Sequence, residues 1–171
     1  MFELKLVMRH YKFGIVIIFL FVSCSSDNVE KFYNIPYGTN IDTVRDIFNK
    51  KNIKIVSEDI ESNNNTIVIN IIINGSYFNE ECEVMFVFWD GIFQNGGYKI
   101  FGYSKERLSE IMNNIIKKLT NEFKKEPVIT YEGSLFYWVL DNKIIVSIFN
   151  VEDFLIIGYT GEEYLLHRNG A

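Results

Sequence analysis

The run Thr66–Asn74 does most to limit what this chain can fold into, because every residue in it except the two asparagines is β-branched. Side chains of this kind are stiff at χ1 and fit the pleated surface of a strand. Six further segments have the same strand-like character: 53–60, 83–89, 128–131, 135–140, 143–149 and 154–159. The dipeptide Asp90-Gly91 predicts a tight hairpin. The tripeptide Asn95-Gly96-Gly97 predicts a bulge or a second turn in the returning strand.

Two other segments have helical spacing. In the first, Thr39 or Asn40 is the expected N-cap, and apolar residues then recur on one face: Ile41, Val44, Ile47 and Phe48. The second helix begins after Ser104 and ends before Pro127, with an apolar stripe made of Leu108, Ile111, Met112, Ile115, Ile116, Leu119 and Phe123. Such a stripe can bind a partner helix, a membrane or the protein's own sheet. Its ordinary width favours core packing.

The order of these elements predicts an α+β fold. We expect two helix-plus-antiparallel-meander units that form one compact domain, with the helices packed on one face of the sheet. The domain is expected over residues 31–160, with possible tandem halves 31–102 and 103–160, and a loose C-terminal tail over 161–171. The hydrophobic content of 48% is enough for a real core. No Pro- or Gly-rich linker separates the halves, which favours a single unit.

The N-terminus resembles a bacterial lipoprotein signal peptide. Basic residues precede the apolar run 14–22, which has the length that a secretory signal needs. Serines surround Cys24, the residue that in such signals becomes the first of the mature protein and carries the lipid. The resemblance implies a signal peptide over 1–23, lipidation of Cys24 and a polar tether over 24–30. Phe21 departs from the leucine that usually stands there, and the alternatives are an uncleaved signal anchor or ordinary signal-peptidase cleavage.

Charge and cysteine content narrow the class of function. The chain has a formal net charge of −5, and loss of the basic signal leaves about −7, which suits neither phosphate backbones nor anionic headgroups. We therefore expect no nucleic acid partner, and membrane attachment only through the lipid on Cys24. Cys82 would then have no disulfide partner and is best explained as a small buried hydrophobe. His167 is the one histidine outside the signal, so no catalytic pairing is indicated.

A second resemblance covers the folded part. The segment Ile35–Phe48 has a Gly before a small hydroxyl residue and a Val one turn into a short helix. This pattern is similar to small outer-membrane assembly lipoproteins of the BamE/SmpA type and to β-lactamase-inhibitor-like tandem domains. The later segment 136–144, with its Trp-bearing strand and turn, resembles the second half of such tandem proteins. The resemblance implies the fold and transfers no functional residue.

Aromatic residues are the best candidates for a contact surface. The candidates are Tyr131, Phe136, Tyr137 and Trp138, which are close together in the sequence, and Trp89 in another hairpin. Exposed aromatic patches mark interfaces. Alternation puts Phe136 and Trp138 on one sheet face and Tyr137 on the other. The alternatives are a two-sided core or ordinary surface tyrosines. No metal or cofactor motif is present: the carboxylates around Cys82 (Glu80, Glu81 and Glu83) are explained by a solvated strand edge.

These observations predict a lipid-anchored, non-enzymatic protein of the bacterial cell envelope. It would face the periplasm or the cell surface, need no cofactor, and serve as a protein-interaction or envelope-assembly module with a protein partner. The alternative is an inhibitor-like or small-ligand-binding lipoprotein on the same scaffold. A concave, aromatic-lined sheet face would favour that alternative, whereas a pocket with two converging carboxylates would favour an enzyme.

Overall fold

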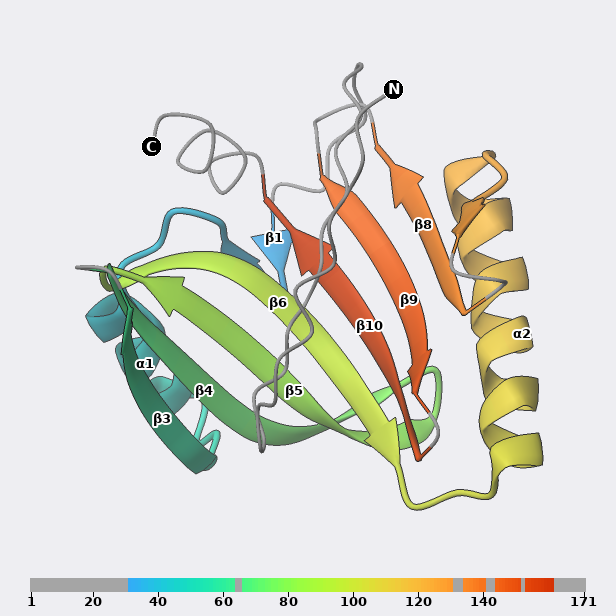
Figure 1. Cartoon of the computed structure of the whole chain (residues 1–171). Helices are drawn as coiled ribbons and strands as arrows, with labels where there is room; N and C mark the ends of the chain where they lie inside the picture. Colours follow the sequence, from blue (N-terminus) through green and yellow to red (C-terminus); the bar gives the residue numbers. More distant parts are fainter. Residues whose placement is uncertain (1–30, 64–65, 131–133, 141–143, 152, 162–171) are drawn as a thin grey trace.

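The computed structural model describes residues 31–63, 66–130, 134–140, 144–151 and 153–161. Eight strands form one antiparallel sheet in the order β3-β4-β5-β6-β10-β9-β8-β7, and two short strands form a separate ribbon (Figure 1). The sheet strands are β3 (Ile55–Asn63), β4 (Thr66–Tyr77), β5 (Glu80–Trp89), β6 (Ile92–Phe101), β7 (Val128–Thr130), β8 (Leu135–Val139), β9 (Ile145–Val151) and β10 (Phe154–Thr160). The ribbon pairs β1 (Lys31–Phe32) with β2 (Ile35–Pro36), and the helices are α1 (Ile41–Lys50) and α2 (Lys105–Phe123).

The expected α+β fold of two helix-plus-meander units is wrong. Most of the described residues lie in strands, and eight of these strands form one continuous sheet rather than two units. The two stretches of strands meet where β10 pairs with β6, from Phe154 opposite Phe101 to Thr160 opposite Asn95. Separate meanders would each leave an unpaired inner edge, and this pairing removes both edges. The physical unit is therefore the sheet, with the helices added to it.

The strand β6 continues through the sequence that was expected to bulge or turn. The register with β5 shifts between Val87 and Phe88, so Gln94 is an extra residue on β6 and forms a bulge. No second turn follows, because Gly96 and Gly97 stay in the ladder. The reason for the glycine is close packing: a Cβ on Gly96 would lie 2.1 Å from Cδ1 of Phe32. The ribbon thus rests directly on the backbone of β6.

Helix α1 begins at the second of its two expected caps. The side chain of Asn40 accepts a hydrogen bond from the backbone N–H of Asp42 at 2.9 Å, while the Thr39 hydroxyl donates to the Pro36 carbonyl. The buried residues of the helix are Ile41, Val44 and Phe48. The Phe48 ring meets Phe86 of β5 edge to face at 5.1 Å between centroids, which places α1 on the sheet.

Helix α2 confirms the core-packing interpretation of its apolar stripe. Ser104 caps it by accepting from the Arg107 N–H at 3.4 Å, and the helix ends where Lys124 adopts a left-handed conformation with φ of 52°. The residues buried beneath it are Leu108, Ile111, Ile115 and Leu119, which join one core cluster with β9 and β10. Figure 1 shows α2 running beside β8 and β9. Within the described chain, neither helix has the length and apolar character needed to cross a membrane.

Candidate functional site

The proposed aromatic surface is divided by the fold. Trp138 is only 1% exposed, its Nε1–H donates to the Lys125 carbonyl at 3.0 Å, and its ring packs edge to face against Phe123 of α2. Phe136 is partly buried and packs against the same core, whereas Tyr137 is buried outside that cluster. Trp138 therefore holds β8 to the end of α2, and its side chain is not available to a partner.

The remaining predicted site residues do not complete a patch. Trp89 lies at the end of β5, and β6, β10 and β9 separate that strand from β8. Tyr131 and Cys24 lie outside the described residues. An aromatic contact surface that unites β5 and β8 is therefore not formed by the described side chains.

A tyrosine cluster that the sequence did not reveal lies on the core side of the sheet. Tyr77 and Tyr98 stack at 4.2 Å between ring centroids, and the hydroxyls of Tyr77 and Tyr159 are 2.7 Å apart. Burial raises the pKa of Tyr159 to about 12; the hydrogen bond to Tyr77 lowers it, and the Glu122 charge raises it more weakly. The three tyrosines come from β4, β6 and β10, so only the strand order brings them together.

Phe32, on the β1–β2 ribbon, packs into this tyrosine cluster. The Phe32 ring lies 5.1 Å from the Tyr98 ring and 5.5 Å from the Tyr159 ring, centroid to centroid, and Phe32 is almost fully buried. The aromatic face on which a small ligand would be expected is therefore occupied by the chain itself. One pattern could have revealed the cluster: each tyrosine lies on the same face of its strand as the buried residues, as the alternation of side chains shows.

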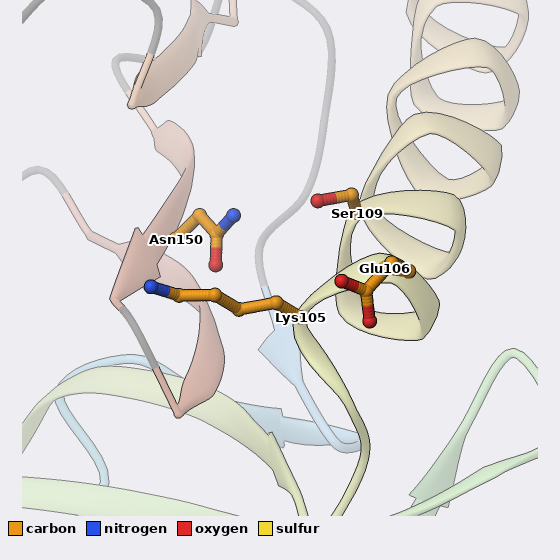
Figure 2. Close-up of a pocket in the computed structure, with 4 residues that line it drawn as sticks. All are labelled: Lys105, Glu106, Ser109 and Asn150. Carbon is orange, nitrogen blue, oxygen red and sulfur yellow. The ribbon is translucent and has the colours of Figure 1, made fainter.

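An open hollow of about 370 Å³ lies between the start of α2 and the end of β9. Figure 2 shows Ser109 on the helix and Asn150 on the strand on opposite sides of it, with Lys105 and Glu106 at its rim. Hydrogen bonds from the helix backbone and from Ser104 lower the pKa of the Glu106 carboxyl. The mixed charges and open walls give this hollow a polar surface without an enclosed ligand site.

Two of the three carboxylates around Cys82 are directed to different partners. Glu80 pairs with Arg107 at 2.8 Å, Glu83 pairs with Lys99 at 3.5 Å, and Cys82 itself is buried in the core. Burial and the nearby Glu83 charge raise the pKa of the Cys82 thiol from 9.0 to about 11. Among the described residues, no three His, Cys, Asp or Glu side chains are grouped to hold a metal ion.

The outer strand β3 is the most accessible part of the sheet. It pairs only with β4 among the described strands, and it carries exposed apolar side chains, Ile60 at 66% and Val56 at 50% exposure. Ile67 on β4 is 48% exposed and stands diagonally from Ile60, whose direct partner is Ile69. We call the strand β3 together with Ile67 the β3 edge. A long edge with apolar side chains is a template for pairing with another chain.

The β3 edge is also acidic. Glu58, Asp59 and Glu61 are exposed along it, and the strand contains neither lysine nor arginine. Glu58 forms an ion pair with Arg45 of α1. No family model, curated protein or solved structure matches this chain. The functional assignment therefore depends on this geometry and on the sequence pattern, and the resemblance to BamE/SmpA-type lipoproteins stays a prediction.

Proposed function

We propose that this chain is a lipid-anchored, non-enzymatic protein of the bacterial cell envelope whose sheet binds a partner protein. The anchoring part is supported by the basic segment, the apolar run and the serine-flanked Cys24. A diacyl or triacyl anchor holds a protein firmly on a membrane, whereas one chain binds reversibly. The folded body would then act beside a membrane, facing the periplasm or the cell surface.

The observation that carries the binding role is the β3 edge. It carries exposed Val56 and Ile60, with Ile67 on the neighbouring strand, and among the described strands it pairs on one side only. Strand-adding proteins use this arrangement for recognition. The two other accessible features support it less. The aromatic face is filled by Phe32, and the hollow beside α2 is open and polar. The small-ligand alternative therefore has weaker support than protein docking.

Cys82 offers no support for an enzyme. Its thiol is buried and its raised pKa keeps it protonated near neutral pH, whereas a nucleophilic cysteine needs a thiolate. The neighbouring Glu83 carboxylate also opposes ionisation, since its charge adds to the rise in the Cys82 pKa. The position suits a small packing side chain in the core cluster that also contains Val84.

Fatty-acid labelling in a bacterial host tests the anchor. Cells that express the full chain are fed a labelled fatty acid, and the wild type is compared with Cys24→Ala and with the matched control Cys82→Ala. We expect label in the wild type and in Cys82→Ala, and none in Cys24→Ala. Label that persists in Cys24→Ala, or a wild-type protein that carries no label and keeps residues 1–23, would refute the anchored function.

A further inference from the structure

We infer that the β3 edge binds an extended cationic segment of the partner as a ninth strand of the sheet. This inference rests on the proposed function and names the partner chemistry for it. In strand addition, backbone hydrogen bonds supply affinity and alternate side chains supply specificity. Both requirements can be examined along residues 55–63.

The backbone requirement is met by length and by position. The strand β3 spans nine residues, longer than a typical strand of about 5–6. A bulge at Val56 separates Ile55, opposite Ile73, from the regular pairing that runs from Ser57 opposite Ile72 to Asn63 opposite Thr66. On its other side, no strand of the described chain pairs with it. A row of backbone donors and acceptors along that side is therefore open to an incoming segment.

The side chains specify the sequence pattern of that segment. Because neighbours alternate between faces, Ile60 lies on the core side with Ile69, whereas Asp59 and Glu61 lie on the other face opposite Asn70 and Val68. Within the described residues, no lysine or arginine lies within ion-pair distance of Asp59 or Glu61. The matching segment has an apolar residue opposite Ile60, flanked on each side by lysine or arginine.

A second copy of this chain fits less well. In a symmetric antiparallel pair, one residue of β3 must face its own copy, because paired residues share a face. A pair centred on Ile60 places Asp59 opposite Glu61, and pairs centred on Glu58, Asp59 or Glu61 place a carboxylate opposite itself. Like charges directly opposite one another destabilise a sheet. The registers that overlap most of β3 therefore disfavour self-pairing, and the acidic edge favours a cationic segment.

The opposite edge supplies a matched control. The strand β7 is only three residues long, and its Ile129 is 57% exposed, close to the exposure of Ile60. The pair Ile60→Asn and Ile129→Asn therefore removes a similar apolar surface from each edge. Three residues offer too few backbone groups to hold an extended segment, so only the first substitution should affect binding.

The experiment uses the full-length chain in detergent and two labelled heptapeptides. The cationic probe is Lys-Val-Lys-Ile-Lys-Val-Lys, and the anionic probe replaces each lysine with glutamate. Fluorescence anisotropy should show binding of the cationic probe alone. We expect Ile60→Asn to weaken it about tenfold, as the loss of a buried isoleucine contact predicts, and Ile129→Asn to leave it unchanged. The double variant D59N/E61Q should weaken binding and reduce its dependence on salt.

Backbone pairing has its own signature. Two versions of the cationic probe carry N-methyl groups on alternate residues in opposite phases, and only one phase removes the N–H groups that face β3. We expect one version to bind and the other to fail. Equal binding by both versions, equal effects of the two isoleucine substitutions, or no binding of the cationic probe would overturn strand addition. Because fatty-acid labelling of Cys24 is independent of these measurements, such a failure would leave the anchor intact.

Discussion

The two ends of the eight-stranded sheet differ in how they are closed. At the β7–β8 end, α2 runs beside β8 and β9, and Trp138 joins β8 to the chain after the helix through Lys125, whereas the short β7 exposes Val128 and Ile129. At the β3–β4 end, α1 is half as long, and Ile60 and Ile67 remain exposed beyond it. The last strand at the closed end has three residues, whereas the open end has nine. The comparison shows that a buried tryptophan fastens the closed end, whereas the open end consists of exposed isoleucines among carboxylates.

The largest contrast in the free energy of unfolding is expected when one side chain at each end is shortened to alanine. Trp138→Ala should lower the free energy of unfolding by about 3–5 kcal/mol, because it leaves a large cavity in the core. Ile60→Ala should change it by less than about 0.5 kcal/mol, because the side chain is already in water. Urea unfolding of the full-length chain measures both. Similar losses for the two variants would mean that the open end is covered and would break the comparison.

The second prediction concerns β6, which pairs with β10 and so joins the two ends of the sheet. Gly96→Ala places a Cβ against the Phe32 ring, and the overlap should lower the free energy of unfolding by about 1–3 kcal/mol. In the double variant with Phe32→Ala, the cost of the added methyl group should largely disappear. Circular dichroism should show one transition in each case if the sheet is a single cooperative unit. Two separated transitions would mean that the ends unfold independently.

Alkaline pH should lower the free energy of unfolding through Cys82 on β5, in the part of the sheet nearer the open end. Its folded pKa of about 11 lies above the ordinary value of 9.0, so the unfolded thiol loses its proton first. Stability from this group is complete below pH 9 and is lost as the pH rises towards 11. The melting temperature of the wild type should therefore fall more steeply over this range than that of Cys82→Ala. Parallel curves would contradict the burial of this thiol. The tyrosines are present in both proteins, so their titration is shared except at Tyr98, whose pKa the Cys82 charge helps to raise.

The smallest effect is expected at the ion pair that links α1 to the β3 edge. A double-mutant cycle with Arg45→Gln and Glu58→Gln should give a coupling of about 0.2–1 kcal/mol, because both side chains are solvent-accessible. The coupling should shrink in high salt. A salt-independent coupling well above this range would show that the open end is held more firmly than its exposure indicates.

Local signals in the sequence identified the elements. Ser104 and Pro127 bounded the long helix, and Asp90-Gly91 formed the expected hairpin, with both residues at positive φ. The sheet as a whole was not predicted, because the pairing of β6 with β10 joins residues more than 50 positions apart. The packing of Phe32 over Gly96 likewise depends on a contact that no local pattern encodes.

The candidate site was missed for the same reason. The segment 53–60 was correctly expected to contain a strand, but whether a strand lies at an edge depends on the order of all the others. The density of aromatic residues around Trp138 indicated a surface, whereas the fold uses that side chain to fasten α2. Exposure of Ile60 could not be inferred, since isoleucine in a strand is ordinarily a core residue.

Hydrogen–deuterium exchange of the full-length chain, with and without the cationic heptapeptide, tests the central claim most directly. If the peptide joins the sheet, amides of residues 55–63 that face outward become protected, while those of β7 exchange as before. Protection elsewhere in the described chain with none in β3, or no protection at a peptide concentration that saturates binding, would contradict the account.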